Sequence, residues 1–184
     1  MNGANIFTRK ANEMPFYFSP AEFQMPATQE LKDGDTWLIT KPFVYVRANG
    51  SKLFVPPSGL GSLDDMTQKP VWTTDYGSIP MAVQNLFRKD GAYAPAYVLH
   101  DWLYASEMFD RATCDWILLE ALQELGAFWL TRNTIYSAVR AGGGEVWAAH
   151  DPLIVAGLKE YQTDFMAALL TQNSPWPDLV GWAA

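Results

Sequence analysis

The carboxyl-terminal half of the chain carries apolar residues at helical spacing. From Tyr93 onward this pattern predicts four helices, at about 94–107, 111–125, 128–140 and 152–170. Asp110 and Asp151 stand where N-cap residues are expected, and Gly126 lies just past the end of the second helix. Glycine disfavours helix interiors, so the run at 142–144 predicts that the third helix ends there.

The preceding segment is rich in β-branched and aromatic residues. Residues 36–56 predict a small antiparallel hairpin or meander, with Asn49-Gly50 as a turn. Residues 57–92 read mostly as loop, apart from a short helix at about 81–88. Strands are thus expected first and helices after them.

The first 35 residues show no clean period, and three prolines interrupt any helix there. We therefore divide the chain into an extended arm at 1–35, one domain at 36–172 and a tail at 173–184. The expected fold class is α+β: a small antiparallel β-element followed by a layer of three or four helices, two of which form an antiparallel pair.

The first helix pair gathers several polar residues. His100 and Tyr104 are four residues apart and therefore share one face of their helix. The connection to the next helix is short, which favours antiparallel packing. Asp115 falls within the apolar stripe of that second helix, and a buried carboxylate needs a partner. We expect Asp115 to bond to His100 and Tyr104.

This arrangement has a chemical consequence. A carboxylate that accepts a hydrogen bond from one imidazole nitrogen fixes the tautomer, and the other nitrogen can then take a proton from water. Asp101 points elsewhere and could hold a hard cation such as calcium, which would polarise a substrate carbonyl. The alternative is that His100 is a core histidine whose only role is to bond Asp115.

Two further residues are candidates for a cleft beside His100. Asp75 and Ser78 lie in a polar loop segment that a scaffold could position for use. Asp75 could instead bond its own backbone in a turn. Ser78 as a nucleophile is disfavoured, because the sequence lacks the strand-to-helix elbow that such serines occupy.

The remaining charged candidates favour structural interpretations. His150-Asp151 reads as the start of the last helix, with Asp151 as its cap. Arg111 reads as a surface residue in a first helical turn and Arg140 as a charge at a helix C-terminus. Binding of an anionic substrate group is the alternative for both arginines.

Composition narrows the function classes. The chain has 184 residues with 13 Lys and Arg against 20 Asp and Glu, a net charge of −7, which argues against nucleic-acid binding. Cys114 is the single cysteine, so an intrachain disulfide and a Cys-based zinc site are excluded. No apolar run is long enough to span a membrane, and the first residues lack the apolar core of a signal peptide. We expect a soluble protein.

His100-Asp101, Tyr104 and Cys114-Asp115 resemble the core of phospholipase A2. The resemblance implies that His100 is the general base that activates water, that Asp115 orients His100 with help from Tyr104, and that Asp101 ligates calcium. The disulfide-free form carried in parvovirus capsid proteins would be the closer analogue. The glycine-rich calcium loop of that family has no convincing counterpart before His100.

A longer resemblance covers roughly residues 50–142. The order of short motifs in this segment resembles the pattern TD-x-ASIP … LHD-x-LY … R-x-x-AD … Y-x-AVR of an uncharacterised family found mainly in tailed bacteriophages and prophages. This chain departs from it at Tyr76-Gly77, where the family usually has an apolar residue and alanine. The resemblance implies a phage origin and supplies no activity.

Two functions follow as hypotheses. The first is a phage hydrolase that cleaves an ester or amide at cell entry or exit, with the phospholipase A2-like site just described. The second is a non-catalytic virion component, associated with tail or capsid, in which the His-Asp-Tyr-Asp cluster only stabilises the helix pair. Either protein would be made in the host cytoplasm, and the second would join other phage structural proteins in the virion.

Overall fold

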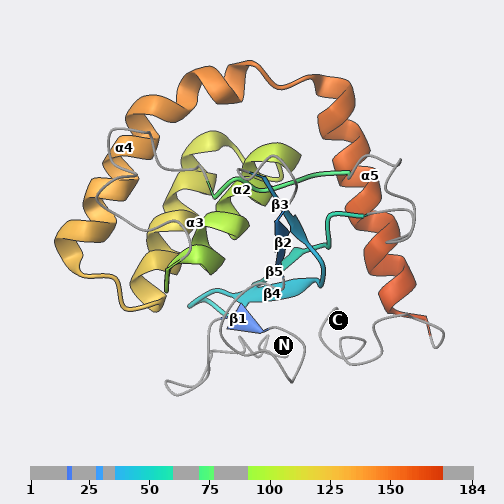
Figure 1. The fold of residues 1–184 in the computed structure, drawn as a ribbon, viewed down its shortest axis with the longest axis horizontal. Coiled ribbons are helices and arrows are strands. Elements are labelled where there is room, and N and C mark those ends of the chain that lie inside the picture. The colour runs from blue at the N-terminus through green and yellow to red at the C-terminus, as the bar shows by residue number, and fades with distance from the viewer. Residues whose placement is uncertain (1–15, 18–27, 31–35, 60–70, 77–90, 172–184) are drawn as a thin grey trace, which may run out of the picture.

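The computed structural model describes residues 16–17, 28–30, 36–59, 71–76 and 91–171. Within them, short strands come first and long helices follow (Figure 1). The strands are β1 (Phe16–Tyr17), β2 (Thr28–Glu30), β3 (Trp37–Ile39), β4 (Phe43–Val46) and β5 (Lys52–Val55). The helices are α2 (Ala94–Ser106), α3 (Arg111–Glu124), α4 (Trp129–Ala148) and α5 (Pro152–Leu169). The chain is an α+β protein, as the sequence predicts.

The predicted hairpin is formed by β4 and β5. The strands pair antiparallel with Phe43 opposite Val55, and the Asn49-Gly50 turn lies between them. Gly50 has a φ of 84°, and the Ser51 N–H donates to Asn49 Oδ1 at 2.9 Å. Within the segment interpreted as an arm, β1 pairs with β4 and β2 pairs with β3, so these two short stretches add strands to the domain.

Both faces of the hairpin are buried. Side chains alternate along a strand, so neighbouring residues face opposite sides. One face enters the main core with α2 and α3, and it comprises Phe43, Tyr45, Leu53 and Val55. The other face packs beneath α5, and it comprises Val44, Val46 and Phe54 with Leu169. Burial on two sides explains why these strands read as continuous apolar runs rather than as alternating ones.

Helix α2 is the central element of the fold. It contacts both α3 and α5, and most of its side chains are buried. Pro95 is tolerated in its first turn, and the helix ends where Glu107 adopts a left-handed φ of 45°. A helix enclosed on all sides has to be apolar around its circumference. His100 is thus a polar residue in an apolar setting and needs a bonding partner.

The predicted caps of the following helices are present. Asp110 accepts a hydrogen bond from the Thr113 N–H at 3.1 Å, and Asp151 accepts one from the Leu153 N–H at 2.8 Å. Gly126, with a φ of 79°, follows the end of α3. The short connection between α2 and α3 returns the chain beside itself, so the two helices pack as the predicted antiparallel pair.

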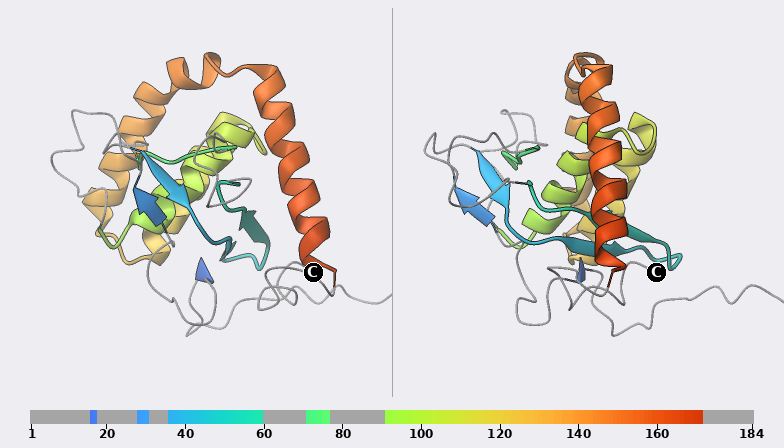
Figure 2. Two further views of the ribbon diagram at one scale, coloured as in Figure 1. Left: turned by 45° about the vertical axis from the view of Figure 1, so that its right-hand side comes forward. Right: turned by 90° about the vertical axis from the view of Figure 1, so that its right-hand side faces the viewer.

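The predicted end of the third helix was wrong. Instead of stopping at Arg140, α4 continues through the glycine run to Ala148 (Figure 2). A side chain at Gly143 would place its Cβ only 2.7 Å from the Tyr104 hydroxyl, so α4 can approach α2 this closely only with glycine there. Packing of this kind offsets the cost of about 1 kcal/mol that each interior glycine imposes. Helices α4 and α5 then arch around α2 (Figure 1).

Some expectations fall outside the described residues. They are Ser78, the short helix at 81–88, most of the arm at 1–35 and nearly all of the tail at 173–184.

Candidate functional site

A cavity of about 530 Å³ lies against α2 and α4. Its volume is in the range typical of sites for small ligands. Its polar lining comes from four parts of the chain and comprises Thr36, Thr73, Asp75, His100, Asp101, Tyr104 and His150. The rest of the lining is mostly apolar and includes Val139 and Val146 of α4. The glycines at 142–143 also line it, so the glycine run leaves room for the cavity as well as for Tyr104.

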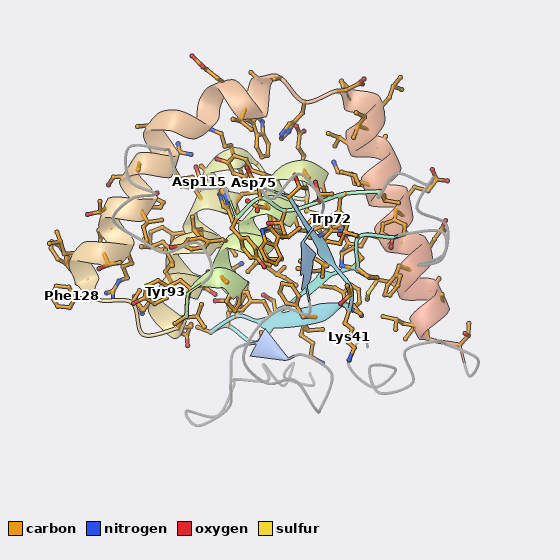
Figure 3. The ribbon with its side chains drawn as sticks, in the orientation of Figure 1. Lys41, Trp72, Asp75, Tyr93, Asp115 and Phe128 are labelled. Carbon is orange, nitrogen blue, oxygen red and sulfur yellow. The ribbon has the colours of Figure 1, made fainter. Side chains whose placement is uncertain are left out.

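The expected contacts around Asp115 are confirmed. The Asp115 carboxylate, which is 0% exposed and labelled in Figure 3, lies with its Oδ1 2.9 Å from His100 Nε2. The Tyr104 hydroxyl donates to the same oxygen at 2.6 Å. His100 and Tyr104 share a face of α2, and their rings are 4.2 Å apart. Helix periodicity was enough to predict that these three side chains lie together.

Two arginines complete the environment of Asp115. Arg111 lies in the first turn of α3, as interpreted from the sequence, but Arg140 is not at a helix C-terminus. Arg140 Nη1 donates to Asp115 Oδ2 at 2.6 Å, and Arg111 Nη1 lies 3.7 Å from the same oxygen. Arg111 also donates to the backbone carbonyl of Arg140 at 3.2 Å. Arg140 is therefore a partly exposed partner of Asp115 on a helix that continues, and not a C-terminal charge. The i,i+4 spacing of Arg111 and Asp115 was a usable signal for the first contact.

These contacts set the protonation states of the cluster. Burial raises the pKa of Asp115, but hydrogen bonds from His100, Tyr104 and Arg140 outweigh it and hold that pKa below its usual value. Burial lowers the pKa of His100 and outweighs the opposite effect of Asp115. Burial and the bond to Asp115 raise the pKa of Tyr104. At neutral pH the cluster therefore holds an ionised Asp115, a neutral His100 and a neutral Tyr104.

The tautomer of His100 follows from these states. An ionised carboxylate can only accept, so Nε2 of the neutral ring carries the proton and donates to Asp115. The other nitrogen, Nδ1, is then the basic one. His100 is only 1% exposed, yet it lines the cavity. The arrangement can hold the ring in one orientation and offer a base to a molecule bound beside it.

Asp101 and Asp75 line the cavity near His100. The Thr74 hydroxyl donates a hydrogen bond to Asp101 Oδ2 and accepts one from the Tyr76 N–H at 3.1 Å. Thr74 is itself fixed to β3, because it exchanges backbone hydrogen bonds with Trp37 at 2.7 and 3.0 Å. Asp75 and His100 line the same cavity, and the bridge between Thr74 and Trp37 of β3 holds this loop there.

Comparison with known proteins places the chain in a family. The model of a family described as "Protein of unknown function (DUF1353)" matches residues 37–139. The chain belongs to the DUF1353 family. Searches among curated proteins and among solved structures found no match. The part shared with DUF1353 runs from β3 into α4 and contains His100, Asp101, Tyr104 and Asp115.

Arg140 and His150 lie just beyond the segment that matches DUF1353. Asp151 caps α5 as predicted. His150 does more than precede that helix. It lines the cavity, and its Nδ1 lies 3.0 Å from Glu107 Oε1. Sequence reasoning missed this position, because it depends on α4 continuing to Ala148 and on where the chain then turns toward α5.

The predicted calcium site can be compared with the residues present. Calcium takes six to eight oxygen ligands in proteins. Among the residues that the structure describes, no group of three or more His, Cys, Asp or Glu side chains is arranged to hold a metal ion. A calcium role for Asp101 stays a prediction. Of the described helices, none combines the length and the apolar character needed to cross a membrane.

Proposed function

We propose that this DUF1353 chain is a hydrolase that cleaves an ester or amide bound in the cavity beside His100. The observation that supports this most directly is the Nε2–Oδ1 contact of 2.9 Å between His100 and Asp115, formed by a histidine that lines a cavity of about 530 Å³. Asp115 orients the ring, and His100 Nδ1 removes a proton from the attacking water. Tyr104 helps to hold Asp115 in place.

The low pKa of His100 is consistent with this role. A base has to be unprotonated before it can act, and burial keeps the His100 ring neutral at neutral pH. The arginines neutralise Asp115, so the carboxylate contributes orientation more than added basicity. The resemblance to phage proteins suggests that the substrate is met when a phage enters or leaves its host, such as a lipid ester or a peptidoglycan amide.

The test is His100→Gln in the purified full chain. A glutamine amide can still donate to Asp115 but has no nitrogen that takes up a proton near neutral pH. We expect hydrolysis of phospholipid vesicles, peptidoglycan or small ester probes to fall about 100-fold or more, which is the usual contribution of a general base. A folded variant that retains full hydrolysis would overturn the proposal. So would a wild-type protein that cleaves none of these substrates.

A structural virion component remains the second candidate, and one surface favours it. The start of α4 exposes consecutive large apolar residues: Phe128, which is labelled in Figure 3, is 71% exposed and Trp129 is 62% exposed. Exposed aromatic side chains of this kind are enriched at protein–protein interfaces.

If the chain is a structural virion component, Asp115 only ties α2, α3 and α4 together. His100→Gln and Asp115→Asn would then alter stability without changing any catalytic rate.

A further inference from the structure

The Asp115 carboxylate is held at both of its oxygens. Oδ1 lies 2.9 Å from His100 Nε2 and accepts a hydrogen bond from the Tyr104 hydroxyl at 2.6 Å, and both of these partners belong to α2. Oδ2 accepts a hydrogen bond from the Arg140 guanidinium of α4 at 2.6 Å. Arg140 therefore binds the second oxygen of a carboxylate whose first oxygen serves His100 and Tyr104.

A carboxylate needs a contact at each oxygen to keep a single orientation. The last torsion of an aspartate side chain is broad, so contacts on Oδ1 alone leave the plane of the group free to turn. A hydrogen bond from a guanidinium to a carboxylate is charge-assisted and is among the strong hydrogen bonds of proteins. The 2.6 Å contact of Arg140 supplies the second fixed point. With both oxygens held, Oδ1 stays directed at His100 Nε2.

Arg140 is itself kept in place by neighbouring helices. Arg111, in the first turn of α3, donates to the Arg140 backbone carbonyl at 3.2 Å. Asp115 also belongs to α3, so each of the two helices donates one arginine hydrogen bond to the other. Gly143 lies three residues beyond Arg140, hence on the same face of α4, and it packs against Tyr104. Helix α4 thus meets the cluster at two points about one turn apart.

Arg140 lies outside the cavity. Among the described residues, His100 and Tyr104 line the cavity and Arg140 does not. The Arg140 side chain is 33% exposed, in contrast to the fully buried Asp115. A substitution at Arg140 can therefore alter the pair of His100 and Asp115 without touching a molecule bound in the cavity and without opening a large hole in the core.

We propose that Arg140 is a positioning residue, which holds Asp115 so that Oδ1 keeps the His100 ring in the orientation used for hydrolysis. This inference rests on the proposed hydrolase. Arg111 lies 3.7 Å from the same oxygen as Arg140 and donates to the Arg140 backbone, so it keeps Arg140 in place. Without Arg140 the carboxylate turns more freely about its last torsion, and the His100 ring loses its fixed partner.

The test compares Arg140→Met with Arg140→Lys in the purified full chain. Methionine has no hydrogen-bond donor, whereas lysine keeps a charged one. The chain has two histidines, so nitrogen NMR of the rings at neutral pH gives two sets of signals, and His100→Gln identifies those of His100. In Arg140→Met we expect the His100 Nε2–H signal to weaken through faster exchange with water. Arg140→Lys should recover part of it, and the His150 signals should not change.

Kinetics on a p-nitrophenyl ester supply the second measurement. We expect kcat of Arg140→Met to fall about tenfold or more, which is the size of effect that a misplaced catalytic group has. KM should stay at its wild-type value, since Arg140 is not part of the described lining of the cavity. Arg140→Lys should recover part of kcat.

A second arginine of α4 supplies the matched control. Arg132 is partly exposed, and its guanidinium donates to the Ala127 carbonyl at 3.0 Å. Arg132→Met should leave the His100 signal, kcat and KM at their wild-type values. Circular dichroism checks that each variant folds. If Arg140→Met does not fold, Arg140→Gln, which keeps only an uncharged donor, replaces it in the comparison with Arg140→Lys.

The outcomes separate the two proposals. If the His100 signal of Arg140→Met matches wild type, the positioning role is wrong, and the hydrolase stands as long as His100→Gln is inactive. A raised KM with unchanged kcat also overturns the positioning role, because Arg140 would then bind substrate. If the His100 signal weakens in Arg140→Met but wild type cleaves no ester, the contact is as inferred and the hydrolase fails.

Discussion

The two histidine–carboxylate pairs of the cavity have nearly the same length and very different surroundings. His100 and Asp115 are 2.9 Å apart, and His150 and Glu107 are 3.0 Å apart. Asp115 is 0% exposed and also faces Tyr104, Arg140 and Arg111. Glu107 is 29% exposed at the end of a helix. The contact distance therefore says little about how much each pair contributes to stability. Burial and additional hydrogen-bond donors decide that contribution.

The largest expected effect comes from removing the charge of each carboxylate without changing its shape. Asp115→Asn removes the counter-charge of two partly exposed arginines and weakens the hydrogen bonds that a buried side chain accepts from His100 and Tyr104, and we expect the free energy of unfolding to fall by about 1–3 kcal/mol. Glu107→Gln removes a partly exposed pair and should cost less than about 1 kcal/mol. Urea unfolding of both variants beside wild type measures the difference. Equal losses would mean that burial does not distinguish the pairs.

A smaller effect should follow from crowding Tyr104, the residue between the two pairs. Gly143→Ala places a Cβ within 2.7 Å of the Tyr104 hydroxyl, which must then move away from Asp115. Overpacking of this kind costs about 1–3 kcal/mol, less the helix preference of alanine over glycine. Urea unfolding of Gly143→Ala should show a net loss of stability. The hydrogen bond between Tyr104 and Asp115 should be weaker than in wild type.

Gly144 supplies the matched control. A Cβ added there meets nothing within 4 Å, so Gly144→Ala should gain the helix preference alone, about 1 kcal/mol. Opposite signs at neighbouring glycines would show that the run is kept for the contact with Tyr104 at one position only. If Gly143→Ala also stabilises the chain, the contact between α4 and Tyr104 is looser than the structure describes.

The first pair could be predicted from sequence and the second could not, for physical reasons. His100, Tyr104 and Asp115 lie on two helices joined by a short connection, so periodicity and the needs of a buried carboxylate were sufficient. His150 and Glu107 are far apart in the chain, and their contact depends on the course of α4. Helix propensity predicts that α4 ends at the glycines, because propensity does not include the tertiary contact that Gly143 permits.

The same limit applies to the fold. Caps and turns such as Asp110, Asp151 and Asn49-Gly50 depend on neighbouring residues and were predicted correctly. The pairing of β1 with β4 and of β2 with β3 joins segments that have little pattern of their own. Arg140 resembles these cases, since its contact with Asp115 required knowing that its helix continues.

The smallest expected effect concerns pH and isolates His100 from its partners. Its pKa in the folded chain lies below the ordinary value of 6.5, so the ring is neutral in both states well above that pH. As the pH falls below about 6.5, the unfolded chain takes up a proton at this position before the folded chain does, and stability decreases. Between about pH 7 and pH 5.5 we therefore expect His100 to make wild type lose stability as the pH falls. His100→Gln should remove that part of the slope, whereas Gly144→Ala should shift the whole curve and leave its slope unchanged. A His100→Gln curve parallel to wild type would mean that the pKa of His100 is the same in the folded and unfolded chains. If wild type instead loses stability relative to His100→Gln as the pH rises, Asp115 keeps the ring protonated in the folded chain, and the base of the first pair is unavailable at neutral pH.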